Sequence, residues 1–270
     1  MTDTQEMTDP QEMTTKALVL VGVAKDFGGV HAVAGLSFAL APGEVVGLVG
    51  PNGSGKTTVV NLASGAVPPS AGTVTVDGTD LTGASSRRFA AAGVVRTFQA
   101  LRLFEGQSAL DNVLVGAQRR VQPSLAGACL RPPRFRSRER DMRRRALAAL
   151  DGMGMSAFAG HPVAGLSHGQ RRRVELARAV AAEPAYLVLD EPAAGVDPVQ
   201  VEVLVTLIRS QRDAGVGILV VEHDPAIVNR VCDRVLGMAE GSVVVSGTYD
   251  QVAAHPALAP ALGQPVPGAG

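Results

Sequence analysis

GPNGSGKTT, residues 50–58, fits the pattern G-x-x-x-x-G-K-[ST] and decides the fold class of this chain. The apolar run EVVGLVG (44–50) before it predicts a buried strand, and VVNLAS (59–64) after it predicts a helix. The glycines allow backbone N–H groups to surround phosphate oxygens. Lys56 offers a charge to the β- and γ-phosphates, and Thr57 offers a hydroxyl to Mg²⁺. The residues expected to contact the phosphates are Gly50, Asn52, Gly53, Ser54, Gly55, Lys56, Thr57 and Thr58.

The composition allows one large domain or two small ones, because 46% of the 270 residues are hydrophobic. The formal net charge is zero, so no global field favours nucleic acid as a partner. Lys56 is one of only three lysines among 25 basic residues. The two cysteines, Cys129 and Cys232, match no metal-binding spacing, and we expect reduced thiols in a cytosolic protein. No uncharged apolar run approaches the roughly 18 residues that a membrane span needs.

Short β-branched apolar runs alternate with helical segments along the chain. This order predicts a mostly parallel sheet that is covered by helices. Asp77-Gly78 indicates a hairpin turn. We expect strands at 17–23, 36–41, 44–50, 73–78, 185–192 and 217–224, and a final hairpin at 234–247.

The middle of the chain, from about 100 to 164, has a helical pattern and predicts an inserted α-helical subdomain. Its arginine-rich stretch, 131–145, is expected to form a solvated helix, and a contact with lipid headgroups or nucleic acid is the alternative. The start (1–16) and the end (263–270) are expected to be loose tails. One unit therefore remains, residues 17–262, with a core at 17–99 and 165–250.

YLVLDEP (186–192) is the second stretch that carries chemistry. Its apolar residues predict a buried strand that ends in Asp190 and Glu191. One carboxylate at the end of the strand can hold the Mg²⁺ shell, and the next can accept a proton from an attacking water. A plain charged strand end before Pro192 is the alternative, and the upstream phosphate loop makes that alternative weaker. The pair Asp190 and Glu191 therefore predicts a metal ligand and a proton acceptor side by side at the end of this strand.

GLSHGQRRRVELARAV (165–180) predicts a helix that begins in an exposed polar cluster. Ser167 stands where an N-cap belongs, and Val174 and Ala177 recur at helical spacing. Gly169 allows another group to approach the backbone closely. A helix N-terminus of this kind suits an anion, and an ordinary capped surface helix is the alternative.

In this order and spacing, GPNGSGKTT, LSHGQ and YLVLDEP resemble the nucleotide-binding subunits of ATP-binding-cassette (ABC) transporters, from residue 17 to about 262. The resemblance implies an α/β fold with a P-loop NTPase (RecA-like) core and a mostly parallel sheet, an antiparallel β subdomain and an inserted α-helical subdomain. It also implies an ATPase that uses ATP and Mg²⁺. The family's signature is LSGGQ in most members. His168 replaces a glycine here, and an imidazole near the γ-phosphate could add a donor or pH sensitivity.

Four further positions match residues that the family uses. Gln99 corresponds to a glutamine that senses Mg²⁺ and the attacking water, and His223 to a histidine that contacts the γ-phosphate. Phe27 matches an aromatic residue that stacks on adenine, and Asp197 lies in the loop through which two subunits meet. A surface glutamine, a structural histidine, a core phenylalanine and a plain N-cap are the alternatives. The resemblance thus implies catalytic roles for Glu191, His223 and Gln99, metal contacts from Thr57, Gln99 and Asp190, and nucleotide contacts from Phe27, Ser167, His168, Gly169 and Gln170.

The resemblance also implies partners. In the family, the signature of one subunit closes over the ATP that the phosphate loop of another subunit holds. A second ABC ATPase subunit, identical or paralogous, is therefore expected, with two ATP molecules at a pseudo-twofold interface. Transmembrane permease subunits and, indirectly, a solute-binding protein are expected as well, and nucleic acid is not. The chain would then lie peripherally on the cytoplasmic face of the inner membrane.

A closer resemblance is to the LivG-type ATPases of branched-chain amino acid importers. It rests on VVRTFQALRLFEGQSALDNVLVG (94–116), the arginine-rich insert, LDEPAAGVDP and VVEHD. It implies that residues 101–112 lie near a groove for a permease helix. The same role in a urea, amide, aromatic-acid or lipid transporter is the near alternative. A non-transport ABC ATPase is disfavoured, since the insert is too short for a long coiled coil and only one cassette is present. A P-loop kinase is disfavoured by LSHGQ and by the pair Glu191 and His223.

Overall fold

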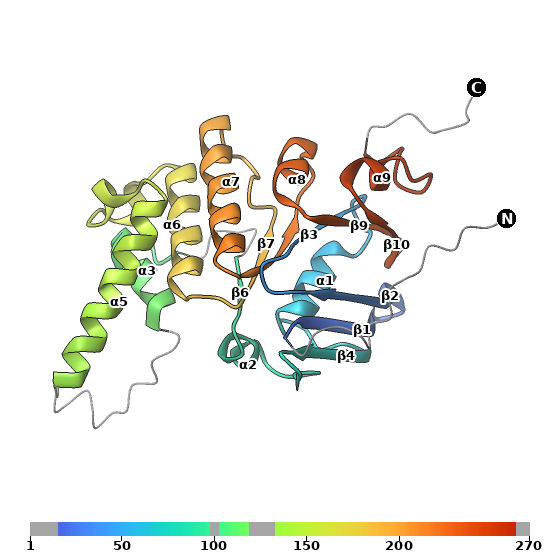
Figure 1. The fold of residues 1–270 in the computed structure, drawn as a ribbon, viewed down its shortest axis with the longest axis horizontal. Coiled ribbons are helices and arrows are strands. Elements are labelled where there is room, and N and C mark those ends of the chain that lie inside the picture. Colours follow the sequence, from blue (N-terminus) through green and yellow to red (C-terminus); the bar gives the residue numbers. More distant parts are fainter. Residues whose placement is uncertain (1–15, 98–102, 119–132, 263–270) are drawn as a thin grey trace.

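The computed structural model describes residues 16–97, 103–118 and 133–262, and two sheets form their centre (Figure 1). The larger sheet has the strand order β10-β9-β3-β8-β7-β6. All its neighbouring pairs are parallel except β9 with β10. The expected α/β fold with a mostly parallel sheet is confirmed. Its strands are β3 (Val45–Val49), β6 (Val94–Arg96), β7 (Tyr186–Asp190), β8 (Gly217–Val221), β9 (Arg234–Ala239) and β10 (Ser242–Gly247).

The smaller sheet is antiparallel, with the order β2-β1-β4-β5. Gly28 and Gly29 have φ values of 52° and 92°, so they close a two-residue hairpin between β1 and β2. Both strands are longer than their apolar runs, because the outer half of this hairpin is largely exposed and carries no apolar pattern. The turn expected at Asp77-Gly78 joins β4 to β5. The strands are β1 (Leu18–Phe27), β2 (Val30–Leu40), β4 (Ala71–Val76) and β5 (Thr79–Asp80).

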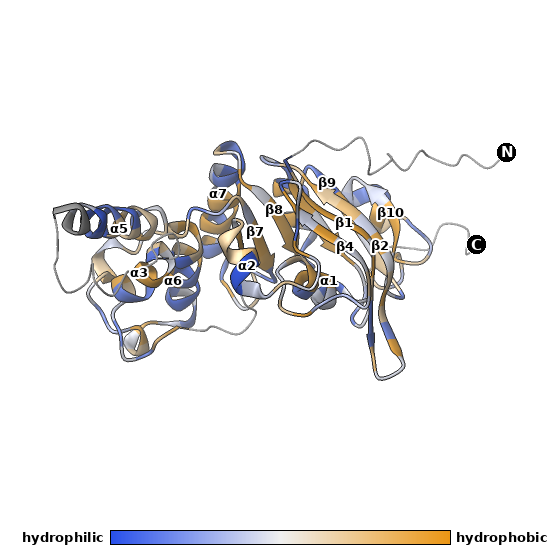
Figure 2. Ribbon diagram, turned by 90° about the horizontal axis from the view of Figure 1, so that it is seen from below, coloured by the Kyte–Doolittle hydropathy of each residue, from blue (hydrophilic) through white to orange (hydrophobic). Residues whose placement is uncertain are grey.

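The central strands are buried on both faces, as their continuous apolar runs predict. Along β7, Leu187 and Leu189 pack into one core cluster, whereas Tyr186 and Val188 pack into another. The second cluster also contains Leu62 and other residues of helix α1 (Lys56–Ala63), together with the antiparallel sheet. Figure 2 shows apolar residues concentrated on these strands. The sheet is therefore covered by helices on one face and by α1 and the second sheet on the other.

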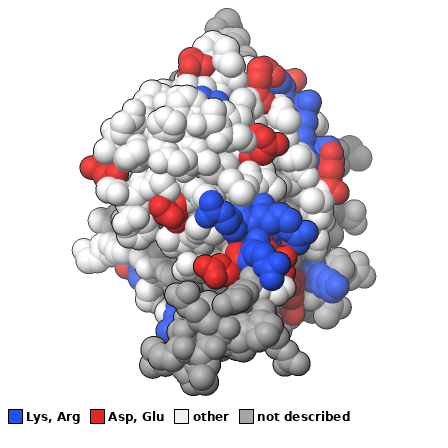
Figure 3. All heavy atoms as spheres, turned by 90° about the vertical axis from the view of Figure 1, so that its left-hand side faces the viewer, with Lys and Arg blue, Asp and Glu red and all other residues white. Residues whose placement is uncertain are grey.

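Three helices pack together at one end of the molecule, on the left of Figure 1. They are α3 (Ala109–Ala117), α5 (Pro133–Gly152) and α6 (His168–Ala181). The arginine-rich stretch lies mostly in α5, where Arg140 and Arg144 are exposed and Arg144 pairs with Asp141. Figure 3 views this end, where basic and acidic side chains lie beside one another. A solvated helix therefore describes the part of the stretch that the structure includes.

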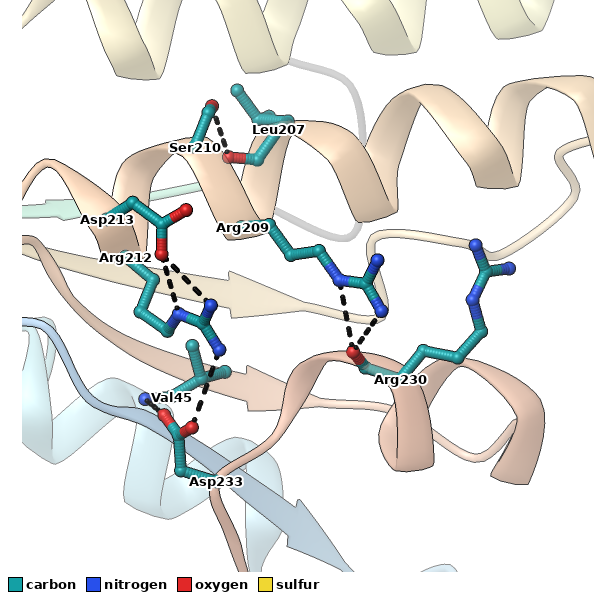
Figure 4. Close-up of polar contacts among 8 residues, drawn as sticks. All are labelled: Val45, Leu207, Arg209, Ser210, Arg212, Asp213, Arg230 and Asp233. Carbon is teal, nitrogen blue, oxygen red and sulfur yellow. Dashed lines mark hydrogen bonds and ion pairs between the residues drawn. The ribbon is translucent and has the colours of Figure 1, made fainter.

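Helices α7 (Pro198–Asp213) and α8 (Pro225–Val231) cover the sheet near β3. The Arg209 guanidinium donates to the carbonyl oxygen of Arg230, and the Asp233 carboxylate accepts from the backbone N–H of Val45 (Figure 4). Arg212 pairs with Asp233 at 3.5 Å. These contacts tie both helices to the first residue of β3, the strand that leads into the phosphate loop.

The remaining helices within the described residues are short: α2 (Ser86–Ala91), α9 (Tyr249–Ala253) and two 3-10 turns, Ser156–Phe158 and Val163–Gly165. No helix in the described ranges is both long and apolar enough to cross a membrane. Residues 1–15 and 263–270, expected to be tails, lie outside the described residues.

Candidate nucleotide site

The phosphate loop is fixed between two strands by close backbone contacts. A Cβ atom on Gly50 would lie 2.2 Å from the carbonyl oxygen of Met238, in β9. A Cβ atom on Gly55 would lie 2.3 Å from the carbonyl oxygen of Ala32, in β2. Gly50 and Gly55 also have φ values of 155° and 101°. Glycine is therefore required at both positions for packing as well as for conformation.

Lys56 is the buried cation of this loop. Its ammonium group donates to the carbonyl oxygens of Gly50, at 2.7 Å, and Pro51, at 2.8 Å. Burial lowers the pKa of Lys56, whereas the nearby carboxylates of Glu191 and Asp190 act to raise it. The lysine therefore lies within electrostatic reach of the acidic pair, where it can meet phosphate oxygens.

Other donors at the loop fit an anionic ligand. The Ser54 hydroxyl is buried, and no other group in the described ranges hydrogen-bonds to it. Gly55 caps α1 without a side-chain hydrogen bond, so the first turn of this helix keeps N–H groups for an anion. Thr57 lies exposed in that turn. The hydroxyl of Thr57 and the carboxylate of Asp190 are hard oxygen donors, the kind that Mg²⁺ prefers.

Asp190 ends β7 with its side chain 3% exposed. Arg96, at the end of β6, places Nη2 2.9 Å from the Asp190 Oδ2 atom and also donates to Asn61 of α1. The same arginine therefore joins the acidic strand end to the helix that follows the phosphate loop.

Glu191 follows in a left-handed conformation, with φ at 47°. Such a conformation costs a non-glycine residue roughly 1–2 kcal/mol. The His223 Nε2 atom lies 3.3 Å from Glu191 Oε1. Behind the carboxylate, Arg172 donates to the Glu191 carbonyl at 3.0 Å, and the buried Glu222 accepts from the backbone N–H of Ala193 at 2.7 Å. Burial raises the pKa of Glu222.

The signature segment begins α6 as an N-cap. The Ser167 hydroxyl accepts from the backbone N–H of Gln170, and the Gln170 side chain accepts in turn from the backbone N–H of Ser167. This capping box confirms the N-cap expected at Ser167, and it satisfies two backbone N–H groups at the start of the helix. Gly169 allows close approach as expected: a Cβ atom there would lie 2.0 Å from Oε1 of Gln200. His168 is exposed.

Phe27 lies at the tip of the β1–β2 hairpin and is 47% exposed, so it is not a core residue. The Lys25 ammonium group lies 5.1 Å from the centre of its ring. The Asp197 side chain accepts from the backbone N–H of Gln200, so Asp197 is the N-cap of α7. The roles of Phe27 at adenine and of Asp197 between subunits stay predictions.

The structure thus brings Lys56, Asp190, Glu191 and His223 to one edge of the parallel sheet. The signature segment begins α6, and in Figure 1 this helix lies on the opposite side of α7 from α1 and its phosphate loop. Gln99 lies outside the described residues. Sequence reasoning missed Arg96, Arg172 and Glu222, which hold the acidic strand end.

A phosphate loop between a buried parallel strand and a helix, beside an acidic pair at a nearby strand end, defines a P-loop nucleoside triphosphatase. Residues 33–194 match the family described as ABC transporter, and the chain belongs to that family. It is an ATP-binding ATPase of the kind that energises transport.

Two curated relatives cover most of the chain. The high-affinity branched-chain amino acid transport ATP-binding protein BraF of Pseudomonas aeruginosa is 35% identical over 90% of this chain and 96% of its own length. The corresponding protein LivG of Escherichia coli K12 is 36% identical over the same shares.

Two solved structures share the fold. A nucleotide-free ATP-binding cassette from an ABC transporter has a TM-score of 0.78 and 27% identity, over 90% of this chain and 97% of that one. A dimeric cassette in a post-hydrolysis state, bound to ADP and Pi, has a TM-score of 0.73 and 25% identity, over 86% of this chain and 98% of that one.

The Arg96–Asp190 pair gives a prediction about stability. Arg96→Met removes the guanidinium from a buried carboxylate, so we expect the free energy of unfolding to fall by about 3 kcal/mol or more. Urea unfolding at pH 7 without nucleotide measures this change. Arg144→Met is the matched control, because its ion pair with Asp141 is more than half exposed and should contribute less than about 1 kcal/mol. Equal losses in the two variants would contradict the prediction.

Proposed function

We propose that this chain is the ATP-hydrolysing subunit of an importer for branched-chain or other hydrophobic amino acids. The observation that carries the proposal is its 35–36% identity to BraF and LivG over 90% of its length. The shared length includes the phosphate loop, the acidic strand end and the helical group, so the likeness is not confined to the nucleotide motif. Peripheral attachment at the cytoplasmic face of the inner membrane, through permease subunits, follows from this role.

In the proposed site, ATP lies along the phosphate loop. Residues 50–58 donate backbone N–H groups to its phosphates, Lys56 neutralises β- and γ-oxygens, and the exposed Phe27 ring stacks on adenine. Thr57 and Asp190 would hold Mg²⁺, with Gln99 at its water shell. The metal would supply positive charge that stabilises the negative charge developing on the phosphate oxygens.

Glu191 is the proposed general base. It is the carboxylate next to the metal-site Asp190, whose own carboxylate pairs with Arg96. The Glu191 carboxylate accepts the proton of the attacking water, and His223, 3.3 Å from it, contacts the γ-phosphate. The Lys56 charge lies opposite and stabilises the leaving phosphate oxygens.

The second half of each site comes from another subunit in this proposal. The signature residues Ser167, His168, Gly169 and Gln170 begin a helix that lies away from the chain's own phosphate loop (Figure 1). The dimeric cassette that shares this fold supports an arrangement of two subunits. ATP would then favour the closed dimer, and its hydrolysis would remove the γ-phosphate contacts and allow opening.

The role of Glu191 predicts a separation of binding from turnover. Glu191→Gln keeps the shape of the side chain but removes the base, so we expect ATP hydrolysis to fall by roughly two or more orders of magnitude. ATP should remain bound, as measured by equilibrium binding of a fluorescent ATP analogue. Lys56→Ala should instead weaken binding itself. Normal turnover of Glu191→Gln would reject the assignment of the base.

The arrangement between subunits predicts the effect of Ser167→Arg. A bulky cation at the start of α6 should block closure on a partner's nucleotide, so hydrolysis that depends on protein concentration should be lost. The isolated chain should still bind ATP within about twofold of wild type, because its own phosphate loop is untouched. An equal collapse of ATP binding would mean that residue 167 contacts the nucleotide of its own chain.

The solute class is tested in the assembled transporter. Membrane vesicles that contain this chain assembled with permease subunits and a solute-binding protein should accumulate radiolabelled leucine when ATP is present inside. We expect Glu191→Gln to abolish that uptake. Uptake of urea, an amide or an aromatic acid in place of leucine would reject the amino-acid assignment and leave the ATPase role in place.

A further inference from the structure

Three consecutive arginines, Arg171 to Arg173, follow the start of α6, and they face different parts of the molecule. Arg171 donates to the carbonyl oxygens of Leu166 and Ala164, which precede the helix. Arg173 donates to the carbonyl of Met153, after α5. Arg172 alone of the three is buried, with 4% of its surface exposed. A buried guanidinium requires several partners, since it brings five N–H donors out of water.

Those partners are the backbone of the acidic strand end. Arg172 Nη2 donates to the carbonyl of Glu191 at 3.0 Å and to that of Asp190 at 3.3 Å, and Nε donates to the carbonyl of Pro192 at 3.3 Å. Its Nη1 atom donates to Glu175 Oε2 at 2.6 Å, one helical turn further along α6. Glu175 is itself 1% exposed. One guanidinium therefore holds three successive carbonyls and is held in turn by a buried carboxylate.

Glu191, the middle residue of these three, has an unfavourable backbone conformation. Glu191 has a positive φ, which a residue other than glycine adopts only where surrounding contacts enforce it. Arg172 fixes its carbonyl from the α6 side. Glu222 fixes the N–H of Ala193, just after it, from the end of β8. The direction in which the Glu191 side chain leaves the backbone is thus set by two buried charged groups that hold the backbone on its C-terminal side.

We propose that Arg172, held by Glu175, is a positioning residue that aims the Glu191 carboxylate at the attacking water. This inference rests on the proposed role of Glu191 as the base. In this role Arg172 acts through the backbone of residues 190–192, to whose carbonyl oxygens it donates. Its loss therefore lowers the rate of the chemical step and leaves ATP affinity unchanged.

The test uses the full chain and MgATP, with kcat and KM from steady-state hydrolysis and Kd from equilibrium binding. Arg172→Lys keeps the charge and loses the planar fork of donors. We expect it to lower kcat tenfold or more while KM and Kd stay within twofold. Glu175→Gln, which removes the negative charge that anchors the guanidinium, should also lower kcat. Arg173→Lys is the control on the same helix and should keep kcat within twofold.

The same Arg172→Lys change is then made in the Glu191→Gln variant, to distinguish a positioning role of Arg172 from a general structural one. In Glu191→Gln, single-turnover hydrolysis over hours should be changed less than twofold by adding Arg172→Lys, because the group that Arg172 aims is already absent. A merely structural arginine would lower the residual rate by the same factor in both backgrounds, and that result would overturn the proposal. Where Arg172→Lys fails to fold by circular dichroism, Glu175→Gln is subjected to the same comparison and the same criteria.

Different results would reject Glu191 as the base and Arg172 as the positioning residue. Normal turnover of Glu191→Gln would reject the proposed base, and the positioning role with it. An inactive Glu191→Gln beside an Arg172→Lys or Glu175→Gln variant with wild-type kcat would reject the positioning role alone. Loss of ATP binding in Arg172→Lys, with the control intact, would show that the arginine supports the nucleotide pocket instead.

Discussion

The parallel register of β3, β8, β7 and β6 is the constraint on which the site depends. Neighbouring parallel strands place their carboxyl ends at the same edge of a sheet, and ligands of open α/β sheets bind there. The phosphate loop follows β3, His223 lies just beyond β8, and Asp190 and Arg96 end β7 and β6. The strand order therefore brings together residues that lie up to 167 positions apart in sequence, from Lys56 to His223.

Several charged side chains are buried at or near that edge, and each of them has an ion pair or hydrogen bonds that fix its position. Asp190 faces Arg96, Glu175 faces Arg172, and Lys56 donates to two carbonyls of its own loop. Each of these groups would be expensive to bury alone, since desolvation of an ion costs several kcal/mol. The pairs arrange the site before a nucleotide arrives, so the fold itself supplies the preorganisation that catalysis of phosphoryl transfer needs.

The parts of this arrangement that the sequence predicts are those with a local pattern. Glycine spacing predicts the phosphate loop, and apolar runs that end in acid or histidine predict β7 and β8 with Asp190, Glu191 and His223 after them. The outer half of the β1–β2 hairpin has no apolar pattern, so the strands that the sequence predicts at 17–23 and 36–41 are shorter than the observed β1 and β2. Arg96 and Glu222 pair with residues that are distant in sequence, and nothing in their neighbourhood indicates the partner.

Arg172 is different, because a signal for it exists in the sequence. Gly169, Arg172, Leu176 and Ala179 recur at helical spacing, and all four are buried. An arginine on an apolar helix face implies a buried partner, yet within a run of three arginines it resembles a solvated charge. Only the fold shows that this face of α6 meets the end of β7.

The position of Arg172 on α6 places it near the signature segment. Little more than one helical turn separates it from Ser167, so one helix carries both the signature residues and the guanidinium that holds the carbonyl of Glu191. In the proposed dimer, the signature closes on the partner's nucleotide while Glu191 acts on its own. The start of α6 therefore takes part in both proposed sites, through its N-cap in one and through Arg172 in the other.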